Sequence, residues 1–149
     1  MNAAHLHLVL THAPTFAILF GVVLWLAGLI LRSPDFRRAA LLLFALAGAL
    51  SAAAYFTGGP AAQSLRTMPG MNRDLLDQHQ EVAVLAFVMT ATLGLAALAG
   101  LIAFRPPKPT PRWFAVLALV LVLVAGGLMT WTSYLGGKAR HSEIQPTTR

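Results

Sequence analysis

Four long apolar segments without a charged residue constrain this chain more than any other feature of its sequence. They cover about residues 12–31, 39–56, 82–104 and 113–135. The length of each segment is close to the roughly 20 residues that a helix needs to cross a hydrocarbon core about 30 Å thick. The segments are apolar on every side, and none alternates as a β-barrel strand does. The sequence therefore predicts an all-α integral membrane protein with four spanning helices.

The composition excludes other classes of protein. Only 11% of the 149 residues are charged and 57% are hydrophobic, whereas about 25% are charged in a soluble domain. Too few polar side chains remain to cover a soluble surface, and such hydrophobicity excludes intrinsic disorder. The net charge is +6, but the 11 basic residues stand in small groups between apolar segments. We therefore expect contact with the lipid bilayer and no nucleic-acid partner.

Turn-forming residues separate the four segments. Ser33 and Pro34 follow the first segment, and a proline-rich stretch over residues 105–112 separates the third from the fourth. These short links favour antiparallel neighbours, hence an up-down-up-down four-helix bundle. The glycine pairs in residues 57–60 and 136–137 are expected to end the second and fourth helices. We predict a single domain over residues 1–149 and identify no repeat between its halves.

The basic residues close to the segments predict the orientation of the bundle. Six of them occupy the two short links, opposed only by Asp35, and five lie on the other side with four carboxylates. Because basic residues mark the cytoplasmic side, we predict that both termini lie outside and that the first helix is uncleaved. The first set is Arg32, Arg37, Arg38, Arg105, Lys108 and Arg112; the second is Arg66, Arg73, Lys138, Arg140 and Arg149.

All five histidines fall on the predicted outer side: His5, His7, His12, His79 and His141. His12 stands at the mouth of the first segment, and His79 lies one turn before the third. An ionisable residue at this depth typically faces the bundle interior and has a function. The alternative is that these histidines bind only water and lipid headgroups at the membrane surface.

Histidines on opposing helices can hold haem iron between two imidazoles, with small residues leaving space for the macrocycle. We predict His12 and His79 as the haem or metal pair, with His7 and His141 as a second or supporting pair. Tyr134 and Arg140 are further candidates for binding the cofactor, for example through haem propionates. Three or four converging histidines would instead suit zinc or copper. The chain has no cysteine, which excludes covalent c-type haem.

Four short elements resemble a bacterial four-helix membrane family of unknown function. The family's opening motif, His-Pro-x-x-x-His-Phe-Pro, is similar to residues 7–14, with departures at Leu8 and Ala13. Its Thr-Gly turn is similar to residues 57–58, and its third helix begins with a histidine, as here at His79. Its closing Leu-Gly-Gly…His element is similar to residues 135–141. His5 has no counterpart.

Some members of that family are fused to Rieske iron–sulfur domains, which implies redox work beside the bacterial cytoplasmic membrane. We therefore predict a b-type cytochrome-like electron-transfer module. It would hold haem b on the periplasmic side and belong to a larger redox complex rather than act as a stand-alone enzyme. The alternatives are a zinc- or copper-binding membrane protein that uses the same histidines, and a structural subunit without a cofactor.

Overall fold

The computed structural model describes residues 3–105 and 108–140, with side chains for residues 5–105 and 108–139, and within them it contains four helices and no strand. The helices are α1 (Ala3–Ile30), α2 (Pro34–Leu65), α3 (Arg73–Ala103) and α4 (Arg112–Arg140). The predicted all-α class is confirmed. Each helix also contains a segment that is long and apolar enough to cross a membrane.

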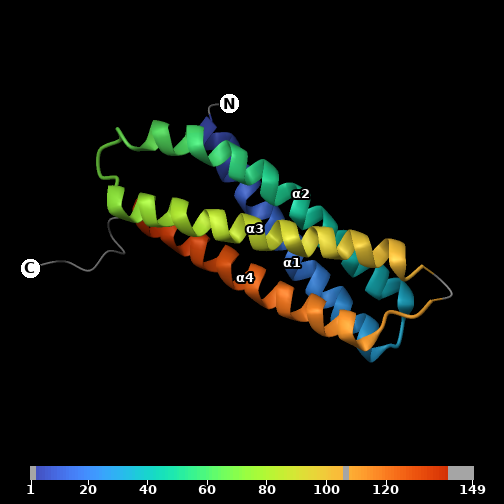
Figure 1. Ribbon diagram of the computed structural model, residues 1–149. Helices are drawn as coiled ribbons and strands as arrows, with labels where there is room; N and C mark the ends of the chain where they lie inside the picture. The colour runs from blue at the N-terminus through green and yellow to red at the C-terminus, as the bar shows by residue number, and fades with distance from the viewer. Residues whose placement is uncertain (1–2, 106–107, 141–149) are drawn as a thin grey trace, which may run out of the picture.

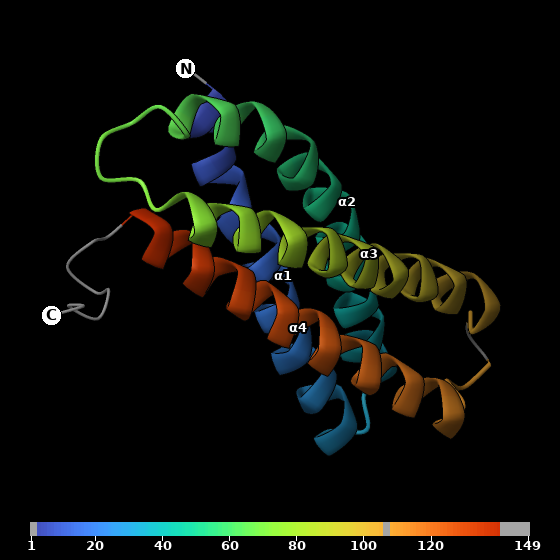
Figure 2. The ribbon, with the colours of Figure 1, turned by 60° about the vertical axis from the view of Figure 1, so that its left-hand side comes forward.

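The helices pack side by side in chain order (Figure 1). The links after α1 and after α3 lie at one end, which we call the paired-link end. The link over residues 66–72, the start of α1 and the end of α4 lie at the other, which we call the histidine end. Figure 2 shows the α1–α2 pair crossing the α3–α4 pair, so that the two pairs lie apart at the histidine end. Contacts between α1 and α4 are sparse.

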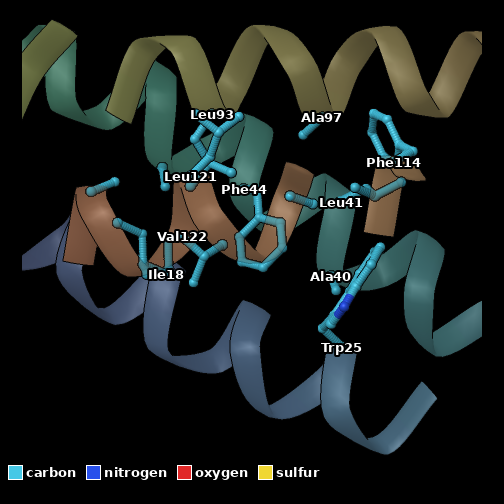
Figure 3. Close-up of a cluster of buried hydrophobic side chains, with 14 residues drawn as sticks. Ile18, Trp25, Ala40, Leu41, Phe44, Leu93, Ala97, Phe114, Leu121 and Val122 are labelled. Carbon is cyan, nitrogen blue, oxygen red and sulfur yellow. The ribbon is translucent and has the colours of Figure 1, made fainter. Parts of the chain in front are cut away.

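A core of buried apolar side chains fills the middle of the bundle and extends towards the paired-link end (Figure 3). Phe44 of α2 and Leu93 of α3 are both 1% exposed, and Trp25 of α1 packs beside Phe44 with ring centroids 6.3 Å apart. Large apolar residues also cover the outside, where Leu123 is 66% exposed. An apolar exterior of this kind is suited to contact with lipid rather than water.

Two glycines bring α2 and α3 together near their midpoints. A Cβ atom added to Gly48 would lie 2.9 Å from Cα of Gly94, and one added to Gly94 would lie equally close to Cα of Gly48. Small residues allow such backbone contact in membrane helices, where packing drives association. This contact therefore fixes the separation of the two central helices.

The helices extend further than predicted at the histidine end. α2 continues through Gly58, Gly59 and Pro60 to Leu65, and α4 continues through residues 136–137 to Arg140. The prediction that the glycine pairs end these helices was wrong. Tertiary packing outweighs the low helix propensity of glycine, because the alanines that follow are buried: Ala61 and Ala139 at 1% exposure each, and Ala62 at 5%.

The extra length places a helical collar beyond the predicted apolar segments. The four helices have 28, 32, 31 and 29 residues, and about 20 suffice to span a bilayer. Residues 3–11, 57–65, 73–81 and 136–140 all lie beyond the predicted segments at the histidine end. A nine-residue helical extension is about 14 Å long. The collar therefore positions side chains well outside the apolar middle of the bundle.

The glycine contact yields a stability prediction. Gly94→Ala forces a methyl group against the α2 backbone, so we expect the free energy of unfolding in detergent to fall by about 1–3 kcal/mol. Gly127→Ala is the matched control, because nothing lies within 4 Å of a Cβ atom added there. Denaturant unfolding followed by circular dichroism measures both. Equal stability of the two variants would contradict the role of the contact.

Candidate functional site

A cavity of about 890 Å³ lies at the histidine end, between the collar and the adjoining ends of the apolar segments, and is bounded by residues of all four helices. Its volume falls within the roughly 300–1,000 Å³ typical of ligand sites. Apolar and small residues form most of the wall, and no described Asp, Glu, Lys or Arg side chain lines it. Its polar groups include the imidazoles of His5, His7, His12 and His79. The described wall is thus uncharged except where a histidine takes up a proton.

The imidazole of His79 is held by the backbone of the neighbouring helix. Its Nδ1 lies 2.8 Å from the carbonyl oxygen of Thr132 on α4. A carbonyl only accepts, so Nδ1–H is the donor, and Nε2 of the neutral ring keeps its lone pair. His79 is half-buried and lines the cavity. The contact therefore selects the tautomer in which Nε2 is able to bind a metal.

His7 is held in the same way between α1 and α2. Its Nδ1 lies 3.0 Å from the carbonyl oxygen of Ala54 and 3.2 Å from Oγ1 of Thr57. The Thr57 hydroxyl donates to the carbonyls of its own helix, at 3.0 Å to Ala53 and 2.9 Å to Ala54. Because its proton is used in this way, the Thr57 oxygen accepts a hydrogen bond from Nδ1–H of His7. Nδ1 is again the protonated nitrogen, and Nε2 keeps its lone pair.

One glycine of each pair lets an imidazole lie against the neighbouring helix. A Cβ atom added to Gly58 would lie 3.2 Å from Cε1 of His7, and one added to Gly136 would lie 3.1 Å from both Cε1 and Nδ1 of His79. A side chain at either position would crowd the ring. The glycines that were predicted to stop the helices are thus part of the site's wall.

The arrangement of His7 and His79 matches the way proteins hold metal-binding histidines. Such a ring usually donates its second N–H to a carbonyl or carboxylate, which fixes its orientation and tautomer. Two carboxylates, Asp77 and Glu81, flank His79 in the sequence. The structure gives it a backbone carbonyl, which no side-chain pattern could reveal.

The remaining predicted site residues are placed differently. His12 lines the cavity but is exposed. Tyr134 is outside the cavity wall and 51% exposed, stacked on Trp131 at 5.4 Å and covered by Nζ of Lys138 at 5.7 Å. Its position does not favour a contact with a ligand in the cavity. His141 and the side chain of Arg140 lie outside the described residues.

The structure does not assemble a metal site with three protein ligands within its described part, where no three histidine, aspartate or glutamate side chains cluster. Asp77, two residues before His79, pairs instead with Arg66, which also donates to Gln80 at 3.2 Å. This polar group joins the end of α2 to the start of α3 across the link. The Asp77 carboxylate therefore links the two helices and does not serve as a metal ligand.

Comparisons with protein-family models, with curated proteins and with solved structures find no match to this chain. The function must therefore be inferred from the site. Its features are a ligand-sized cavity with no charged side chain in its described wall and two imidazoles whose Nδ1 atoms are bonded to carbonyls.

The carbonyl contacts predict a measurable protonation pattern. In the ligand-free protein, we expect the neutral rings of His7 and His79 to carry their proton on Nδ1, because the carbonyls of Ala54 and Thr132 accept from it. ¹⁵N NMR of imidazole-labelled protein reports the tautomer. Signals are assigned by the single variants His7→Gln and His79→Gln. A proton on Nε2 in either ring would contradict the assignment.

Proposed function

We propose that the chain is a b-type haem protein of the bacterial cytoplasmic membrane that transfers electrons on the periplasmic side. The observation that carries the proposal is the cavity of about 890 Å³ with two imidazoles, His7 and His79, tied through Nδ1 to carbonyls of neighbouring helices. Two nitrogen lone pairs in an apolar chamber inside a helical bundle are what haem iron requires of a protein.

The chemistry of the wall fits an apolar macrocycle. Tyr55 and Phe87 line the cavity from α2 and α3, and their rings stack across the two helices with centroids 4.6 Å apart at 10°. Small residues such as Ala83, Ala86 and Gly137 form other parts of the wall. Flat aromatic surfaces and small side chains leave space for a planar ligand. The absence of fixed charges among the described residues of the wall suits the apolar body of the porphyrin.

Haem, when bound, supplies one-electron chemistry, and ligation by two histidines leaves no coordination site for oxygen. The chain itself fixes the orientation of both imidazoles and surrounds them with the mostly apolar wall of the cavity. The carbonyls of Ala54 and Thr132 hold the rings in orientation and raise the basicity of Nε2. Electron transfer therefore suits this site better than oxygen activation does.

The proposed topology is up-down-up-down with both termini in the periplasm. Described basic residues at the paired-link end include Arg32, Arg37, Arg38, Arg105 and Arg112, close to the apolar segments. Basic residues in short links mark the cytoplasmic side, so the histidine end faces the periplasm. The resemblance to a family with Rieske fusions supports a place in a larger redox complex, with a periplasmic electron carrier as partner.

Spectroscopy of the purified protein tests the proposed function. Expressed with a supply of haem, the wild-type chain should be red, contain one haem per chain, and show sharp bands on reduction. His79→Ala should lose most of the haem or the low-spin spectrum, whereas Thr92→Val, outside the cavity wall, should match the wild type.

Metal analysis of the same preparation separates the alternatives. Stoichiometric zinc or copper without haem would replace the haem proposal by a metal-ion site. A colourless, metal-free and well-folded protein that takes up no added haemin would overturn the cofactor proposal and favour a structural subunit.

A further inference from the structure

Contrary to the expectation from the sequence analysis, the two helical hairpins, α1–α2 and α3–α4, repeat each other in sequence. Residues 26–30 and 98–102 are both Leu-Ala-Gly-Leu-Ile, and the same interval of 72 positions separates His7 from His79. Six more residues separate this pentapeptide from the start of the next helix in the second hairpin, so α2 and α4 align at an interval of 78. Identical pairs at that interval include Phe36 and Phe114, Ala40 and Ala118, Ala47 and Ala125, Gly48 and Gly126, Gly58 and Gly136, Gly59 and Gly137, and Ala61 and Ala139.

The contacts of the site follow the same two intervals. His7 donates to the carbonyl of Ala54, and His79 donates to that of Thr132, the counterpart of Ala54. Each ring also lies against the glycine four residues further along the same helix. The hydrogen bond and the glycine contact therefore occur together in both hairpins. Among the residues that make these contacts, the histidine and the glycine are the ones that the two hairpins have in common.

Helix packing far from the site repeats in part. At the paired-link end, Gly28 lies against Arg37 and Cβ of Phe36, and its counterpart Gly100 lies against the ring of Phe114. In each hairpin a glycine thus faces the first turn of the following helix.

Counterpart positions also face each other between the hairpins. A Cβ atom on Gly48 would lie 3.3 Å from the Thr90 carbonyl oxygen, and one on Gly126 would lie 3.8 Å from Cγ2 of Ile18, the counterpart of Thr90. These repeats are what a pseudo-two-fold axis along the bundle would produce, as in membrane proteins with parallel repeats.

One substitution explains where the symmetry is broken. Gly94, which allows α2 to touch α3, has Val22 as its counterpart on α1. The larger side chain prevents α4 from approaching α1 in the same way, and contacts between α1 and α4 are sparse. The break lies in the middle of the bundle, so the repeated histidine contacts at its end are preserved.

We propose that the cavity lies on this pseudo-two-fold axis and that His7 and His79 are equivalent ligands of a single haem. The inference rests on the proposed haem function and replaces the predicted pair of His12 and His79. His12 has Val84 as its counterpart and is exposed, so the repeat gives it no partner. Two equivalent positions supply one pair of ligands, hence one haem per chain.

The equivalence is tested by the spin state of haem in single variants of the full chain. His7→Ala and His79→Ala should each convert low-spin haem to a high-spin form with one remaining histidine, to a similar extent. Added imidazole should restore the low-spin spectrum in both, which shows that each variant is folded. His12→Ala should keep the wild-type spectrum, and the double variant His7→Ala/His79→Ala should retain no haem.

The repeated glycines supply a second, matched set of variants. Gly58→Ala and Gly136→Ala crowd the two rings, and haemin affinity should fall in both by about 10- to 100-fold, as when the support of a metal ligand is lost. Gly127→Ala is the control, because Gly127 lies outside the cavity wall and nothing lies within 4 Å of a Cβ atom added there.

The outcomes separate this inference from the function on which it rests. A wild-type chain that binds no haemin rejects the proposed function itself. Haem that binds to the wild type but stays low-spin in His7→Ala, or becomes high-spin in His12→Ala, overturns the equivalence and leaves the function standing. A measured content of two haems per chain would likewise overturn the claim that His7 and His79 are the pair of ligands of a single haem, and would leave the proposed function standing.

Discussion

The backbone contact between Gly48 and Gly94 is the constraint on which the rest of the bundle depends. It brings α2 and α3 together near their midpoints, where the neighbouring Ser51 and Thr90 are buried and donate to carbonyls of their own helices at 2.8 and 2.7 Å. Large side chains such as Phe44 and Phe114 fill the space towards the paired-link end. Towards the histidine end the pairs of helices separate (Figure 2), and the cavity occupies that space.

The cavity has a defined chemistry because its two histidines are fixed by the main chain. A carbonyl of a neighbouring helix satisfies Nδ1 of each ring, and a buried polar group without such a partner would be costly. A glycine beside each ring provides the space for it. The same hydrogen bond that stabilises the fold therefore also leaves Nε2 ready to act as a ligand.

Hydropathy was enough to predict the four helices, because charges are excluded from lipid and apolar length is a direct physical requirement. It did not predict where α2 and α4 end, since burial of Ala61 and Ala139 outweighs the effect of Gly58 and Gly136 on local propensity. The imidazole partners could not be read from sequence, because any residue has a carbonyl. The repeat was readable in residues 26–30 and 98–102 but is masked by the apolar composition around it.

Electron paramagnetic resonance of the oxidised, haemin-loaded wild-type protein tests the central claim most directly, because it reports the axial ligands of ferric haem. Ligation by His7 and His79 predicts a low-spin signal of the bis-imidazole type at one haem per chain. A dominant high-spin signal, or the absence of any haem-bound species after loading, would contradict the account.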